Sequence, residues 1–345
     1  TEPQFAEQII KMGNADLVAF GRQSLADPHT PQKAMEERLE DLTPCIACLQ
    51  GCVANMYAGN PVCCLTNPFL GHEAEPIEKT ENPKKVMVIG GGVAGLCAAF
   101  IAKEKGHEVT LYEAGDVLGG NMRLAAYPPG KGDITNMIRS YIHRCQKDGV
   151  KIVMSCEVTP ELIKEEKPDS VIIATGSKTL ILPIEGIDNP AIIHGSDLLD
   201  GKRAAGKKVL VVGGGMVGCE TAAFLGEQEH DVTVIEFRDT VGADVIHEHR
   251  VYLMKDFEDY GIKEITGAKV CKFYEDGVEY ETADGVRHET RGYDSVILSM
   301  GFRNYNPLEE KIKDLVPETH VIGDAIRARR ALDATKEAYA VASKL

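Results

Sequence analysis

One pattern occurs twice in this chain, and it constrains the fold more than any other feature. An apolar run of the kind found in buried strands leads into Gly-Gly-Gly-x-x-Gly, first at Gly90 and again at Gly213, 123 residues later. In each copy an acidic residue follows 23 positions after the first glycine, Glu113 in one and Glu236 in the other. A strand, a glycine turn, a helix and a later acid together are typical of a dinucleotide-binding fold. Two matched copies therefore predict two nucleotides held by one polypeptide.

Both turns have the residues that a pyrophosphate site needs. Glycines permit a tight turn and a close backbone approach, while the next helix presents free N–H groups and a partial positive charge of about 0.5. The acid accepts hydrogen bonds from the ribose hydroxyls. The predicted contacts are Gly90, Gly92, Gly95 and Glu113 in the first copy, and Gly213, Gly215, Gly218 and Glu236 in the second.

Glu236 also bears on the choice between NADH and NADPH. A 2′-phosphate about 4 Å from a carboxylate is repelled by about 4 kcal/mol per charge at an effective dielectric constant of about 20. Arg238, two residues later, would soften this repulsion. We therefore expect NADH at a site that contains Glu236.

Length and charge exclude several classes of function. The 345 residues are enough for two or three domains, and the net charge of -15 argues against binding to nucleic acid. The longest uncharged apolar run, 86–102, is too rich in glycine and too short to span a membrane. The chain begins with Thr and shows no signal peptide, so we expect a piece of a larger cytoplasmic protein. The final Ser-Lys-Leu matches a peroxisomal signal, but it ends a helical pattern.

Five of the ten cysteines lie within 20 positions, and such clustering favours metal binding over disulfides. Their spacing is less usual for zinc, which prefers paired Cys-x2-Cys motifs, and suits an iron–sulfur cluster. Spacing alone leaves open whether Cys63 or Cys64 is the fourth ligand. Cys97 and Cys219 stand alone in the two motif helices, where we expect small packing residues.

The rest of the chain predicts a β-α pattern with parallel-sheet character. Each copy of the motif is followed by a further buried strand that ends in glycine, at Gly176 and at Gly301. The repeat therefore covers a whole domain and not only the glycine motif. The remaining expected elements are a helix over 5–12, a short strand over 16–20, a helix from about 32, a loop over 43–82, a short strand over 321–324 and a helix from about 331.

The residues after Glu113 resemble the FAD domain of the flavoprotein reductases that have two dinucleotide-binding domains. In that family the first fold holds FAD, an inserted second fold holds NAD(P)H, and the chain returns to the FAD fold with a Gly-Asp pair. The carboxylate of Asp324 would then bind the ribityl chain of FAD. The resemblance implies FAD contacts at Gly120, Asn121, Lys131, Gly176, Gly323 and Asp324, and an NADH contact at Gly301. No redox-active cysteine pair follows residue 84, which disfavours a disulfide reductase.

From end to end the chain resembles the C-terminal half of the multidomain relatives of old yellow enzyme. These include 2,4-dienoyl-CoA reductase, 2-enoate reductase and trimethylamine dehydrogenase. In that family the last cysteine of the loop precedes Leu-x-Asn-Pro, and Cys64 is followed by Leu-Thr-Asn-Pro. The resemblance therefore implies a 4Fe-4S cluster and leaves Cys63 as an extra thiol. The implied ligands are Cys45, Cys48, Cys52 and Cys64.

That family begins with a TIM barrel that holds FMN, and residues 15–28 resemble its strand-8 segment. Phosphate sites of such barrels commonly form after strands 7 and 8, which implies Gly21 and Arg22 as contacts of the FMN phosphate. One strand cannot close a barrel. We therefore expect FMN only in the full-length enzyme.

The fold class expected is α/β. Two Rossmann-like, three-layer dinucleotide-binding domains, for FAD and NAD(P)H, follow a Cys-rich iron–sulfur loop and the last β-α unit of a TIM barrel. The expected domains are 1–42 for the barrel unit, 43–83 for the cysteine loop and linker, 84–195 for the first part of the FAD domain, 196–303 for the inserted NADH domain and 304–345 for the return to the FAD domain.

The expected function is transfer of electrons from NADH to FAD, to the 4Fe-4S cluster and to FMN, which would reduce an activated C=C bond of an enoate or a dienoyl-CoA. The proton donor and the pocket for the small-molecule substrate would lie in the missing barrel, so no catalytic residue is expected here. Three alternatives stay open: an ADP-binding structural module as in trimethylamine dehydrogenase, an electron-input protein like the small subunit of glutamate synthase, and an NADH reductase stapled by zinc. The oligomeric state is not predicted.

Overall fold

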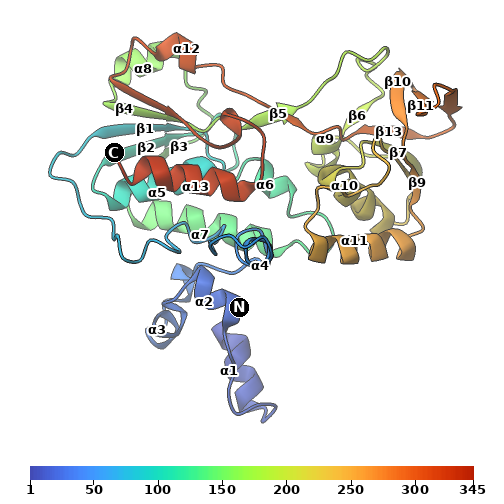
Figure 1. Ribbon diagram of the computed structural model, residues 1–345. Helices are drawn as coiled ribbons and strands as arrows, with labels where there is room; N and C mark the ends of the chain where they lie inside the picture. The colour runs from blue at the N-terminus through green and yellow to red at the C-terminus, as the bar shows by residue number, and fades with distance from the viewer. The chain divides into compact units, whose positions relative to one another are not determined.

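A computed structural model describes residues 1–345, and the chain forms two compact units (Figure 1). The first unit consists of residues 1–123, 133–177 and 304–345. The second consists of residues 124–132 and 178–303. The chain thus leaves the first unit for a long excursion and returns to it. No helix is long and apolar enough to cross a membrane.

The first unit is built on a five-stranded sheet in the order β15-β4-β1-β2-β3, with every pair parallel. The strands are β1 (Lys85–Ile89), β2 (Glu108–Tyr112), β3 (Lys151–Val153), β4 (Ser170–Ile173) and β15 (Glu318–Val321). The outer strand β15 comes from the returning end of the chain, and Glu318 pairs with Ser170 of β4. The returning segment therefore completes this sheet.

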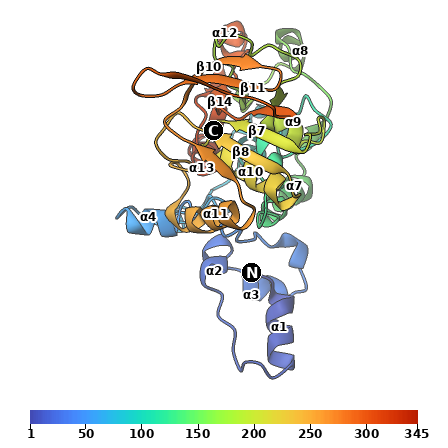
Figure 2. The ribbon, with the colours of Figure 1, turned by 90° about the vertical axis from the view of Figure 1, so that its right-hand side faces the viewer.

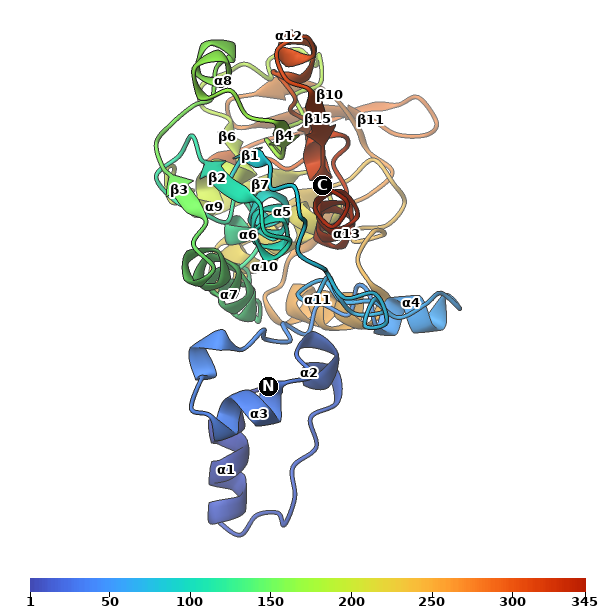
Figure 3. The same ribbon diagram turned by 90° about the vertical axis from the view of Figure 1, so that its left-hand side faces the viewer.

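Alternating apolar side chains bury both faces of the sheet, as a fully covered parallel sheet requires. Val86 and Val88 belong to the core under α5 (Val93–Glu104), α7 (Asp133–Lys147) and α13 (Ala331–Ala342). Met87 and Ile89 belong to the opposite core, with α8 (Pro160–Glu166) and α12 (Glu309–Ile312). Figure 3 shows the two helical layers on either side of β1 and β2. The first unit is thus a three-layer α/β fold, as expected.

The N-terminal part of the first unit contains helices but no strand. Its elements are α1 (Pro3–Lys11), α2 (Gly21–Ala26), α3 (Thr30–Met35), η1 (Leu39–Asp41) and α4 (Val53–Tyr57). The strand expected over 16–20 is therefore wrong, because a parallel strand needs neighbours for its backbone hydrogen bonds and none exists here. The helix expected from about 32 begins at Thr30.

The second unit also has a five-stranded parallel sheet, in the order β6-β13-β7-β8-β9. Its outer strand β6 precedes the other four in the chain, whereas β15 of the first sheet follows the other four. The strands are β6 (Ile193–His194), β7 (Lys208–Val212), β8 (Asp231–Ile235), β9 (Lys263–Ile265) and β13 (Ser295–Leu298). Helices α10 (Met216–Glu227) and α11 (His247–Asp259) pack on one face. A three-stranded antiparallel sheet packs on the other (Figure 2), formed by β10 (Lys269–Tyr274), β11 (Gly277–Glu281) and β12 (Arg287–Thr290).

Residues 178–195 lie with the second unit, although we expected them in the FAD domain. Their contacts explain the difference. β6 pairs with β13, the Leu180 N–H donates to the Gly301 oxygen at 2.9 Å, and the Phe273 N–H donates to the Glu185 oxygen at 2.7 Å. The chain passes between the units at β5 (Ser177–Thr179) and β14 (Phe302–Asn304), which pair with each other. Three short elements complete the chain: α6 (Asn121–Leu124), α9 (Gly195–Leu199) and η2 (Gly323–Ala325).

Candidate functional site

The first glycine has the same conformation and the same close neighbour in both turns. Gly90 has a φ of +108° and Gly213 a φ of +106°, in the region that favours glycine. A Cβ at Gly90 would lie 2.3 Å from the carbonyl oxygen of Ala174, and one at Gly213 would lie 2.4 Å from that of Ser299. Each turn therefore passes directly against the chain that leaves the neighbouring strand, β4 or β13, and no larger residue fits.

The last glycine of each motif lets the helix begin directly on the turn. A Cβ at Gly95 would lie 1.9 Å from the Gly90 oxygen, and one at Gly218 would lie 1.8 Å from the Gly213 oxygen. Such close helix–strand packing is the role expected for this glycine in a dinucleotide fold. The geometry of the two turns agrees to about 0.1 Å in these contacts.

Each acid holds its own turn through backbone N–H groups. Glu113 accepts a hydrogen bond from the Gly91 N–H at 2.6 Å, and Glu236 accepts one from the Gly214 N–H at 2.5 Å. The second oxygen of Glu236 accepts the Arg238 N–H at 2.9 Å. A carboxylate has about four acceptor positions. Both acids therefore keep positions for ribose hydroxyls while they fix the turn.

The start of α5 is open. Gly119 forms a parallel bridge with Gly92 and donates its N–H to the Gly91 oxygen at 2.8 Å, which places Gly120 and Asn121 beside the turn. No atom lies within 4 Å of the position that a Cβ at Gly92 would take, and no side chain caps the helix. The free N–H groups there fit the pyrophosphate of a dinucleotide.

The start of α10 is different, because a carboxylate caps it. The Met216 N–H donates to Asp244 at 2.8 Å, from the loop that follows β8. A Cβ at Gly215 would lie 3.5 Å from that carboxylate. One of the free N–H groups of this helix thus already has a partner within the protein.

The Gly-Asp pair gathers several of the predicted FAD contacts. Asp324 accepts a hydrogen bond from the Ser177 hydroxyl at 2.9 Å and one from the Arg329 N–H at 3.0 Å. The Asn121 amide donates to the Ser177 hydroxyl at 3.3 Å. Gly176, with a φ of +75°, immediately precedes Ser177. Asn121, Gly176 and Asp324 therefore meet around a serine that the sequence analysis did not single out.

Lys131 contacts a helix of the second unit. It belongs to the segment 124–132, which is part of that unit, and its ammonium forms an ion pair with Glu220 of α10. The Glu220 side chain is only 9% exposed, so it needs a partner. The FAD contact expected for Lys131 stays a prediction.

Two buried polar atoms lie just beyond the sheet of the second unit without a partner. They are Nδ1 of His194, at the end of β6, and the hydroxyl of Ser299, directly after β13. Buried polar groups are nearly always hydrogen-bonded, and ligands of open α/β sheets bind at the carboxyl ends of the strands. Gly301, with a φ of +99°, follows on the same segment. These residues fit a polar ligand such as NADH at this edge.

The five clustered cysteines line one small cavity, together with Arg22 of α2. Burial raises the pKa of the Cys48 thiol to about 12, with smaller contributions from three neighbouring cysteines. No group of three or more His, Cys, Asp or Glu side chains is arranged to hold a metal ion. The lining of five thiols has the donor chemistry of an iron–sulfur site. Cys63, which we expect to be an extra thiol, contacts the Asn55 amide at 3.3 Å.

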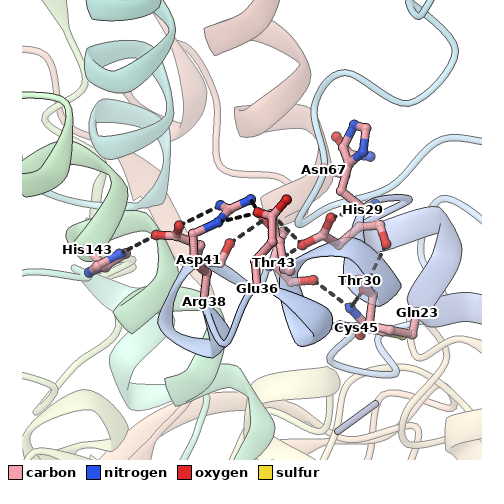
Figure 4. A network of polar contacts seen from close by, with 12 residues as sticks. Gln23, His29, Thr30, Glu36, Arg38, Asp41, Thr43, Cys45, Asn67 and His143 are labelled. Carbon is pink, nitrogen blue, oxygen red and sulfur yellow. Dashed lines mark hydrogen bonds and ion pairs between the residues drawn. The ribbon is translucent and has the colours of Figure 1, made fainter. Parts of the chain in front are cut away.

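A buried glutamine ties the cysteine loop to the N-terminal helices (Figure 4). The Gln23 amide donates to the Thr30 hydroxyl and to the Thr43 oxygen, both at 3.0 Å, and accepts the Cys45 N–H at 2.8 Å. Gln23 is 3% exposed, and its three partners lie in α3 and at the start of the cysteine loop. The side chain next to Arg22 thus positions the first cysteine of the loop.

Asp41 is the second centre of this network (Figure 4). Its carboxylate accepts Arg38 at 2.8 Å, lies 2.9 Å from the His143 ring nitrogen and forms an ion pair with Lys147. Burial raises the pKa of Asp41, but the hydrogen bonds from Lys147, His143 and Arg38 outweigh it and hold the pKa below its ordinary value. Because His143 and Lys147 lie on α7, Asp41 fastens the approach to the cysteine loop onto the first α/β fold.

The two isolated motif-helix cysteines, Cys97 and Cys219, are fully buried in the two helical cores. This confirms the interpretation of both as packing residues. Sequence reasoning missed Gln23, Ser177 and Asp41, because their partners are distant in the chain or are backbone groups. No spacing pattern marks such residues.

The family model described as "Pyridine nucleotide-disulphide oxidoreductase" matches residues 75–322. An NADH oxidase of Thermoanaerobacter brockii is 36% identical over 99% of this chain and 54% of its own length. A cinnamate reductase of Clostridium sporogenes is 32% identical over 100% of this chain and 52% of its own length. The chain spans about half the length of these curated relatives.

Among solved structures, a complex of 2-naphthoyl-CoA reductase with 2-naphthoyl-CoA superimposes with a TM-score of 0.95 at 32% identity. The match covers 100% of this chain and 53% of that one. The comparisons confirm the α/β fold class and the resemblance to the FAD- and NAD-binding half of the old-yellow-enzyme relatives.

Proposed function

Because the chain belongs to the pyridine nucleotide-disulphide oxidoreductase family, whose domain implies binding of FAD and NAD(H), we propose that it is the electron-input part of an NADH-dependent flavin and iron–sulfur reductase. The observation that carries this proposal is the presence in one chain of two matched glycine turns and a loop of clustered cysteines. Two nucleotide sites and one thiol-lined cavity suit a protein that receives electrons as a pair and releases them singly.

In this proposal the first fold holds FAD. The open start of α5 binds the pyrophosphate, Glu113 binds the adenosine ribose, and Asp324 binds the ribityl chain. The second fold holds NADH, with Glu236 on its ribose. Repulsion between Glu236 and a 2′-phosphate supports NADH over NADPH.

Cys45, Cys48, Cys52 and Cys64 would hold the 4Fe-4S cluster, with Gln23 fixing the backbone at the first of them. Bound FAD would accept hydride from NADH, and the cluster would pass electrons on one at a time. In the whole protein, Gly21 and Arg22 would hold the phosphate of an FMN that would accept these electrons. Arg22 already lines the thiol cavity, so its charge would also lie close to the cluster.

The proposed reaction of the whole protein is reduction of an activated C=C bond of a small unsaturated acid or acyl-CoA. The similarity of this chain to a cinnamate reductase and to a 2-naphthoyl-CoA reductase supports this substrate class. The proton donor and the substrate pocket would lie in a barrel domain of which residues 1–42 resemble one unit.

An anaerobic titration of the purified chain with NADH tests this proposal. We expect flavin absorption bands that bleach on addition of NADH, above a broad iron–sulfur absorption that remains. A colourless protein would contradict the proposal and favour an ADP-binding structural module. If the flavin bands bleach but the protein contains no iron or labile sulfide, the chain would instead be a flavin reductase whose cysteines bind another metal.

A further inference from the structure

We propose that Ser177 and the Arg329–Glu337 ion pair are positioning residues that set the Asp324 carboxylate for the ribityl chain of FAD. The inference rests on the proposed function, because it presumes FAD on the first fold. It adds three residues that neither the glycine motif nor the Gly-Asp pair contains. All of them belong to the first unit.

The hydrogen bonds at Ser177 have a fixed direction. A carboxylate can only accept, so the Ser177 hydroxyl donates to Asp324, at 2.9 Å. The same hydroxyl oxygen is then free to accept the Asn121 amide N–H, at 3.3 Å, and the Ser177 carbonyl accepts that amide at 3.4 Å. Asn121 and Asp324, both expected to contact FAD, are therefore linked through one hydroxyl.

A closed ring of contacts holds the other side of the Gly-Asp turn. The Gly323 N–H donates to Glu337 at 2.7 Å, and the second oxygen of Glu337 forms an ion pair with Arg329. The backbone N–H of Arg329 donates to the Asp324 carboxylate at 3.0 Å and closes the ring. Glu337 lies on α13, so the ring fixes the turn to a twelve-residue helix of the core.

Packing prevents the turn from relaxing in another way. Gly323 has a φ of +63°, and a Cβ there would lie 3.1 Å from the Cβ of Ala94 and 3.3 Å from that of Ala334. The turn is thus confined between the first residues of α5 and α13. Because the turn packs closely against both helices, the direction of the Asp324 carboxylate depends mainly on its hydrogen-bond donors.

The remaining acceptor capacity of Asp324 is what makes this arrangement useful for FAD. A carboxylate offers about four acceptor positions, and the Ser177 hydroxyl and the Arg329 N–H take one on each oxygen. At least one position per oxygen remains for the ribityl hydroxyls. An Asp324 without Ser177 would have to be reoriented when FAD binds, which weakens affinity.

The test is titration of the apoprotein with FAD, followed by flavin fluorescence and visible circular dichroism. A hydrogen bond to a charged group contributes enough that S177A should weaken FAD binding about tenfold. S177T, which keeps the hydroxyl, should bind nearly as the wild type does. E337Q keeps an acceptor for the Gly323 N–H but loses the ion pair, so we expect about threefold weaker binding. S343A, which removes a hydroxyl that bonds only the Tyr339 oxygen of the same helix, is the matched control.

A double-mutant cycle distinguishes positioning from a direct contact. If Ser177 acts through Asp324, S177A should weaken FAD binding little further when D324N is already present. Because D324N itself weakens binding, these titrations extend to millimolar FAD. Wild-type affinity in S177A, or the same loss in both backgrounds, would overturn this inference while FAD binding by the wild type stands. A wild-type chain that binds no FAD would overturn the proposed function itself, and the inference with it.

Discussion

The two dinucleotide folds share one turn and differ in what surrounds it. The φ angles of Gly90 and Gly213 differ by 2°. The shortest distances from an added Cβ to its neighbours differ by about 0.1 Å between the two turns. Around α5, however, the site is completed by residues from three distant segments, which include Asn121 and Asp324. Around α10, the capping group is Asp244, from the loop that directly follows β8.

This difference shows how a repeated fold can support two different tasks. The turn itself is set by local sterics, so it is the same in both copies. The surroundings are set by which segments the topology brings to the turn. We infer that the open start of α5 suits a resident FAD, while the capped start of α10 suits an NADH that binds and leaves.

The largest expected effect comes from the last glycine of each motif. A Cβ at Gly95 would lie 1.9 Å from the Gly90 oxygen, so G95A must displace the start of α5. We expect loss of FAD binding and destabilisation by about 3 kcal/mol or more, as for severe overpacking. G218A should do the same to NADH binding, because its contact is 1.8 Å. FAD content, NADH titration and thermal unfolding measure both effects.

G132A is the control for these variants, since no atom lies within 4 Å of its added Cβ and its φ is not positive. The equivalence of the two turns predicts that each variant affects mainly its own ligand. A G95A protein with normal FAD content would show that the first turn is not the flavin site.

A smaller effect is expected from a substitution of Asp41, which connects the cysteine loop with the first fold alone. D41N leaves Arg38, His143 and Lys147 without their carboxylate, and we expect a loss of about 2 kcal/mol in the free energy of unfolding at pH 7. NADH binding to the second fold should not change. Urea unfolding of D41N and of the exposed control D16N measures the difference.

The pH dependence of this effect has a definite sign. The pKa of Asp41 is lower in the folded protein than its ordinary value, so its contribution is fully present above the unfolded pKa of about 3.9. The contribution is lost as the pH falls below that value toward the folded pKa. The gap between wild type and D41N should therefore narrow below about pH 4. A gap that widens in acid would contradict this assignment.

The smallest effect is expected from the acid of the second fold. E236Q removes the charge that would face a 2′-phosphate but keeps an acceptor for the Gly214 N–H. We expect the affinity for NADPH relative to NADH to rise about tenfold, which corresponds to about 1.4 kcal/mol of the repulsion. E113Q, the matching change in the first fold, should leave this ratio unchanged. An unchanged ratio in E236Q would place NADH discrimination elsewhere, for example at Arg238.

Particular residues show how far sequence reasoning reached. The strands that begin near Val86 and Val209 follow from continuous apolar runs, and their glycine turns follow from the spacing of the motif. The strand expected over 16–20 was wrong because strand formation depends on neighbours that the chain does not contain. The ion pair between Lys131 and Glu220, 89 residues away, has no signal in the sequence.

The sequence alone determined the two turns, their acids and the clustering of the thiols, because each depends on residues close together in the chain. Only the tertiary structure decided what completes each turn. Ser177 meets Asp324 across 147 residues, and Gln23 meets Cys45 across 22, through hydrogen bonds that leave no periodicity in the chain. Local sterics can be read from spacing, whereas a contact between distant segments exists only once the sheets have formed and brought those segments together.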